Sequence, residues 1–155
     1  MKRALILLLA ALLTLSAGCG APGGGGGVDP VRLGAELTEK AAGLPPMETV
    51  ENDAELFRYL SDMDYTLVSG YYLAYAASGS AEEIAVLSLK DAADSEAARA
   101  SLERHLAGRL GLFRVYEPEE AALVENAVIA VSGSTLGLFV CDNAGELGRA
   151  FRESA

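Results

Sequence analysis

Residues 65–89 have the sequence YTLVSGYYLAYAASGSAEEIAVLSL. Residues 65–77 are rich in Tyr, Val, Leu and Thr, which fit a pleated, half-buried surface, and they predict a long strand. The sequence Ser78-Gly79-Ser80 predicts a turn, and residues 84–89 predict the returning strand. We therefore expect an antiparallel β-hairpin, against which the other elements of the chain pack.

A second stretch near the C-terminus repeats this order of features. Residues 127–131 and 136–141 predict two strands, joined by a turn at Ser132-Gly133-Ser134. An aspartate and a predicted helix follow each hairpin, which allows two interpretations. The chain contains either two ββα units after an N-terminal helical segment, or two hairpins that use the same turn chemistry independently. Both predict an α+β fold with a four-stranded antiparallel sheet and packed helices.

Capping residues and apolar spacings of three and four predict the helices. They are a helix that starts at Asp29-Pro30 and stops at Gly43, a short helix at 53–60, a long helix at 95–113 and a closing helix at 144–151. In the long helix Leu102, Leu106 and Leu110 share one face, which we expect to pack on the sheet. His105, the only histidine, flanks that face, and we expect a structural role for it.

The residues before the first helix resemble a bacterial lipoprotein signal. Lys2 and Arg3 precede an apolar run at 4–13, which is about half the length needed to span a bilayer. The sequence LSAGC at 15–19 then resembles a lipobox, which implies cleavage before Cys19 and a diacylglycerol thioether on its sulfur. Acyl chains such as palmitate would hold the protein on the extracytoplasmic face of the cell membrane.

These features divide the chain into three parts. Residues 1–18 are predicted to be the signal peptide, and residues 19–28 carry the lipidated cysteine and a glycine-rich linker that spans about 15–20 Å as a flexible coil. Residues 29–155 are predicted to form a single α+β domain. Removing 18 of the 155 residues leaves 137, which is enough for one modest core.

The charge of the chain limits its partners. The formal net charge is −10, and loss of Lys2 and Arg3 with the signal peptide makes it −12. Such a chain repels phosphate backbones, so we expect no nucleic acid partner, whereas a cation or a basic protein surface suits its field. With Cys19 lipidated, Cys141 has no disulfide partner and is expected to be a small buried hydrophobe.

The sequence contains no recognisable catalytic, metal or cofactor constellation. A zinc site needs three or four ligands, which one histidine makes difficult. The stretch GSTLG at 133–137 has its serine in the wrong position for a nucleophile elbow. The adjacent Glu82 and Glu83 point to opposite faces of a strand, unlike the carboxylate pair of a glycosidase. We therefore predict no catalytic residue, no cofactor and no metal site.

Three stretches resemble a known family when taken in order. They are EEIAV at 82–86 after a tyrosine-rich strand, YEPEE at 116–120, and ENAVI at 125–129 before a glycine turn. This order is similar to that of the bacterial lipoprotein family called domain of unknown function 4358, over about residues 29–151. The resemblance implies the outer face of a Gram-positive membrane, and it brings no catalytic residues to this chain.

The main functional hypothesis is a non-catalytic accessory module that docks a protein of the cell envelope. Capture of a solute or cation, and a small envelope enzyme, are the alternatives. The strand at 65–77 is apolar on both faces, which is unusual for a half-solvated antiparallel sheet. Either helices cover both faces in a three-layer core, or one face is open and binds a partner. The candidate partner face consists of Leu67, Tyr71, Leu73 and Tyr75.

The anchor can be tested by removing the lipidated sulfur. Cys19→Ala should leave an uncleaved precursor without a thioether lipid, because the modification requires the thiol. Metabolic labelling with a fatty-acid analogue measures this directly. Equal labelling of the wild type and the variant would show that Cys19 is not the anchor.

Overall fold

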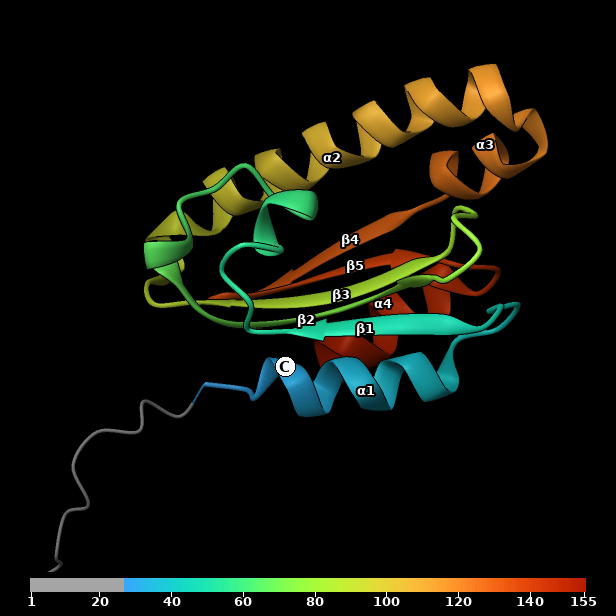
Figure 1. Cartoon of the computed structure of the whole chain (residues 1–155). Helices are drawn as coiled ribbons and strands as arrows, with labels where there is room; N and C mark the ends of the chain where they lie inside the picture. Colours follow the sequence, from blue (N-terminus) through green and yellow to red (C-terminus); the bar gives the residue numbers. More distant parts are fainter. Residues whose placement is uncertain (1–26) are drawn as a thin grey trace, which may run out of the picture.

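The computed structural model describes residues 27–155, which form an α+β fold around one antiparallel sheet (Figure 1). The helices are α1 (Pro30–Lys40), α2 (Ser95–Tyr116), α3 (Pro118–Glu125) and α4 (Ala144–Ser154). The strands are β1 (Met47–Glu51), β2 (Val68–Ala76), β3 (Glu83–Leu89), β4 (Val128–Ser132) and β5 (Thr135–Val140). Three 3-10 turns, η1 (Phe57–Tyr59), η2 (Tyr65–Leu67) and η3 (Ala92–Asp94), complete these elements.

The sheet lies between two layers of helices (Figure 1). α1 and α4 cover one face, with Leu37, Leu147 and Phe151 in its core cluster. α2, α3 and the segment around η1 cover the other face, where Leu102 and Phe57 are buried. This arrangement confirms the three-layer interpretation, and it explains why the tyrosine-rich strand has no polar face.

The sheet has five strands in the order β1-β2-β3-β5-β4, so the prediction of four strands was wrong by one. The missed strand is β1, whose sequence is METVE. It follows two prolines and carries two glutamates, so it lacks the apolar alternation of a recognisable strand. Its pairing with β2, from Met47 opposite Ala76 to Glu51 opposite Tyr72, defines it instead.

The two hairpins are β2–β3 and β4–β5, and a helix follows each of them as expected. They are not copies of one unit, however. β3 and β5 pair antiparallel, so a two-fold axis relating the hairpins would run perpendicular to the sheet and leave both following helices on the same face. Because α2 and α4 pack on opposite faces, the ββα repeat was the wrong interpretation.

Close packing of α1 on the sheet depends on small residues. A Cβ atom on Gly34 would lie 2.3 Å from Cδ1 of Tyr72, and one on Gly70 would lie 3.2 Å from Cγ of Pro30. Each glycine therefore lets helix and strand approach more closely than any other residue would.

Two local predictions need correction. The strand at 65–77 begins later, at Val68, because residues 65–67 form η2. A register shift between Val68 and Gly70 then places Val68 on the face of Tyr71 and Leu73, whereas simple alternation from Tyr71 would place it on the other face. The helix predicted at 53–60 is only the turn η1, and α3 was not predicted as a helix.

Leu102 and Leu112 provide a matched test of how α2 packs. The Leu102 side chain is 1% exposed, whereas Leu112 on the same helix is 61% exposed. Leu102→Ala should lower the free energy of unfolding by about 2–5 kcal/mol, because it leaves a cavity in the core. Leu112→Ala should change it by less than about 0.5 kcal/mol. Equal losses in urea denaturation would contradict this packing.

Candidate functional site

A half-open cleft of about 370 Å³ lies on the α2 side of the sheet. Its wall comes from β1, β2, β3, the segment around η1, and α2. The residues that line it are Val50, Leu56, Tyr59, Leu73, Tyr75, Glu83 and Arg109. The cleft exists because α2 packs over β4 and β5, so only the segment around η1 covers the β1–β2 corner of this face.

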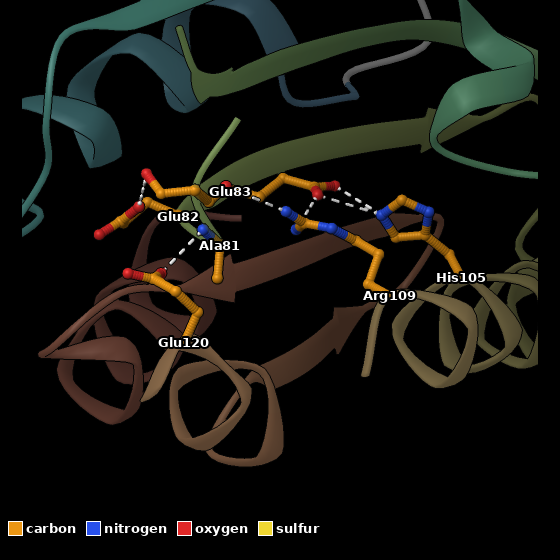
Figure 2. A network of polar contacts seen from close by, with 7 residues as sticks. Ala81, Glu82, Glu83, His105, Arg109 and Glu120 are labelled. Carbon is orange, nitrogen blue, oxygen red and sulfur yellow. Dashed lines mark hydrogen bonds and ion pairs between the residues drawn. The ribbon is translucent and has the colours of Figure 1, made fainter. Parts of the chain in front are cut away.

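A buried polar cluster forms one side of the cleft (Figure 2). Glu83 begins β3, and its side chain is only 5% exposed. His105 and Arg109 lie one turn apart on α2 and point toward it. His105 Nε2 lies 2.9 and 3.1 Å from the two carboxylate oxygens, and Arg109 Nη1 donates to Oε2. An ionised carboxylate only accepts, so Nε2 of His105 carries the proton in this arrangement.

The same cluster fixes the β2–β3 turn beneath the helices. Nη2 of Arg109 donates to the carbonyl oxygen of Ser80 at 3.4 Å, and its guanidinium carbon lies 5.4 Å from the centre of the Phe113 ring. From α3, Glu120 accepts the N–H of Ala81 at 3.0 Å (Figure 2). A buried charge with several partners holds its neighbours in one geometry, so this wall of the cleft is rigid.

The mouth of the cleft is aromatic and exposed. Tyr59 is 62% exposed, and the Arg58 guanidinium carbon lies 5.3 Å from the centre of its ring. The Tyr75 hydroxyl donates to Glu48 Oε2 at 2.7 Å, and this hydrogen bond to a carboxylate raises the pKa of Tyr75. The bond also fixes the Tyr75 ring against the opening.

The predicted partner face is only partly open. Tyr71 is fully buried, its hydroxyl donates to the carbonyl oxygen of Asp53 at 2.6 Å, and burial raises its pKa to about 12. Leu73 is also buried, so the four residues do not share an exposed face. The reason is that the segment around η1 packs on Tyr71, with the Phe57 ring 5.1 Å away. Leu73 and Tyr75 come together in the cleft, while the partly exposed Leu67 lies in η2 outside the strand.

A second, smaller cavity of about 220 Å³ lies beside Asp62 and Ser101. Arg104 donates to both Asp62 oxygens at 2.7 and 2.8 Å, and Ser101 donates to one of them. These bonds hold the pKa of Asp62 well below its usual range. The buried Ser101 hydroxyl is also shared with Ser61, and His105 is engaged by Glu83, so these groups do not form a nucleophile and base.

The structure also bears on Cys141 and on the predictions about metal sites and the membrane anchor. Cys141 is buried, as expected, and burial raises the pKa of its thiol; it is the one cysteine among residues 27–155. Among residues 27–155 no group of three or more His, Cys, Asp or Glu could hold a metal ion. Within the same range no helix is long and apolar enough to cross a membrane. Cys19 and the predicted signal peptide lie outside the described residues.

Sequence reasoning missed Arg109 and Tyr59 as site residues. One signal for Arg109 was present, because His105 and Arg109 are four apart and share a helix face. Two basic side chains on one face of a packed helix need an acidic partner. No sequence signal marked Tyr59, whose position depends on how the segment around η1 folds over β2.

The chain matches a known protein family. The family model described as Domain of unknown function (DUF4358) matches residues 40–141, a range that includes every residue of the cleft. No curated protein and no solved structure matched the chain.

Glu83 can be compared with an exposed ion pair on the same helix. Glu83→Gln leaves the buried Arg109 charge without its partner and should cost about 3–5 kcal/mol of unfolding free energy. The Arg99–Glu103 pair is solvent-exposed, so Glu103→Gln should cost less than about 1 kcal/mol.

Urea denaturation measures both variants. Adding Arg109→Met to Glu83→Gln should recover part of the loss, because it removes the uncompensated charge. Equally small losses of unfolding free energy for Glu83→Gln and Glu103→Gln would show that the Glu83 cluster does not hold α2 on β3.

Proposed function

The chain belongs to the DUF4358 family, and from that premise we propose that it is a non-catalytic interaction module of the cell envelope. A lipid on Cys19 anchors it to the extracytoplasmic face of the cell membrane. The cleft holds part of a protein partner.

The cleft is the observation that carries this proposal. It combines an apolar floor at Leu73, a largely exposed aromatic residue at Tyr59, and a rigid charged wall at Glu83 and Arg109. Tyrosine and arginine are enriched among residues that dominate binding energy, and they act best in pockets that exclude water. A preorganised wall also reduces the entropy lost on binding.

The chemistry of the cleft favours binding over catalysis. Among the described residues that line the cleft, Glu83 is the only carboxylate, and its two oxygens accept from His105 and Arg109. A general base must be free to accept a proton from a substrate, whereas this carboxylate is committed to holding α2 on β3.

The location of α1 agrees with anchoring through the N-terminus. α1 begins at Pro30 on the face of the sheet opposite to the cleft (Figure 1). A tether that ends there leaves the cleft accessible to proteins in the aqueous phase.

Capture of a small solute is the second candidate, and the cleft volume favours it. About 370 Å³ lies at the lower end of the range typical of small-molecule sites. Such a site normally encloses most of its ligand, whereas this cleft is half open.

Site-specific photo-crosslinking in intact cells separates the two candidates. A crosslinking amino acid in place of Tyr59 should give a discrete protein adduct, because Tyr59 lies at the mouth of the cleft. The same amino acid in place of the exposed Glu153, on α4 and the opposite face, should not. Leu56→Asp should remove the Tyr59 adduct and leave the melting temperature nearly unchanged, since Leu56 is partly exposed.

Two results would contradict the proposal. Adducts from Tyr59 that Leu56→Asp leaves intact would place the partner outside the cleft. No adduct, together with a higher melting temperature in a panel of small solutes that Leu56→Asp abolishes, would favour solute capture.

A further inference from the structure

We propose that the partner reaches the cleft as an extended basic segment that adds a strand to the free edge of β1. This inference rests on the proposed function and specifies the chemistry of its partner. It is carried by the edge of the sheet, by the charge of β1, and by the continuity of β1 with the cleft.

β1 is an edge strand whose outer side is unpaired. Ala77 N–H donates to the carbonyl oxygen of Pro46 at 2.9 Å, and Asn52 N–H donates to that of Tyr71 at 3.2 Å. Positions 46 and 52 therefore face β2. Because facing positions alternate along an antiparallel pair, the backbone groups of Thr49 and Glu51 point to the open edge.

Nothing in the described part of the chain occupies that edge. Among residues 27–155, no side chain or loop forms a hydrogen bond to the backbone of Thr49 or Glu51. Figure 1 shows β1 at the near edge of the sheet with no element in front of it. These groups are available to a further strand.

The charge around β1 indicates the charge of the strand that would pair with it. Residues 41–57 contain Glu48, Glu51, Asp53 and Glu55 and no lysine or arginine. Glu48 and Glu51 are exposed on β1 itself. A second copy of β1 would place two more glutamates close to Glu48 and Glu51, which disfavours self-pairing. A strand with Lys or Arg compensates the same charges.

The edge leads directly into the cleft. Val50 belongs to β1 and lines the cleft, and Glu48 is bonded to Tyr75, which also lines it. Side chains of an added strand alternate between the two faces of the sheet, so one of them lies beside Val50 at the cleft. An apolar side chain there would give specificity, while the backbone hydrogen bonds would give affinity.

The other edge of the sheet lacks this combination. β4 has the sequence VIAVS, which carries no charge. None of the residues that line the cleft comes from β4. The charge of the strand and its contact with the cleft therefore favour β1 over β4 as the site of strand addition.

The test uses the whole chain in detergent micelles and three synthetic peptides. The probe is Lys-Val-Lys-Leu-Lys-Val-Lys, acetylated and amidated at its ends. One control has Glu in place of every Lys, and the other has N-methyl groups on alternate residues, which block strand pairing. The probe should bind at least 10-fold more tightly than either control, and its affinity should fall as salt is added.

Hydrogen exchange locates the bound peptide. The amides of Thr49 and Glu51 should exchange at least 10-fold more slowly in the presence of the probe. Thr49→Pro removes an outward N–H that makes no hydrogen bond within the described fold, so it should reduce the affinity for the probe at least 10-fold. Thr49→Val keeps this N–H and should bind the probe as tightly as the wild type does. If Thr49→Pro unfolds, the N-methylated peptide tests the same hydrogen bonds without any change in the protein.

Failure of this inference differs from failure of the proposed function. Equal binding of the probe and the N-methylated peptide, or unchanged exchange at Thr49, would overturn strand addition. A Tyr59 crosslink that Leu56→Asp abolishes and a folded Thr49→Pro retains would also overturn it, and would leave the cleft as the partner site.

Discussion

The structure depends on one constraint, which is that the central strands of the sheet are apolar on both faces. Every residue of β3 and β5 is buried, so helices must cover the sheet from both sides. α1 and α4 share one face. On the other face α2 packs over β4 and β5, and the corner at β1 and β2 has only the short segment around η1 as its cover. The cleft is the space that this incomplete cover leaves, and it opens beside an unpaired edge.

The Glu83 cluster connects this packing to the wall of the cleft. A carboxylate on the first residue of β3 receives hydrogen bonds from two side chains of α2, so helix and sheet are joined by fixed geometry as well as by apolar contact. Such a cluster is costly to break and does not by itself guarantee extra stability, because burying charges costs solvation free energy. The Glu83 cluster instead fixes positions, because it keeps Arg109 and the β2–β3 turn in place at the cleft.

Much of the fold could be predicted from sequence because it depends on local patterns. Both hairpins, the long helix and the closing helix follow from turn residues and apolar spacing. β1 could not be predicted in this way, because an edge strand with two glutamates is defined by its pairing. An isolated glycine within a strand, here Gly70, indicates a bulge but does not fix which residue is displaced, so the face of Val68 could not be derived from alternation. The cleft itself joins Val50 to Arg109, which are distant in sequence, so only tertiary packing could reveal it.

We propose that a partner binds at the cleft and along β1. The most direct measurement is a hydrogen-exchange map of the protein in its native membranes, compared with the same protein purified away from its partners. We expect exchange to slow in the native membranes at Thr49, at Glu51 and in the segment from Leu56 to Tyr59. Slower exchange confined to the exposed end of α2, at Leu112, Val115 and Tyr116, or to the β4 edge, would contradict it.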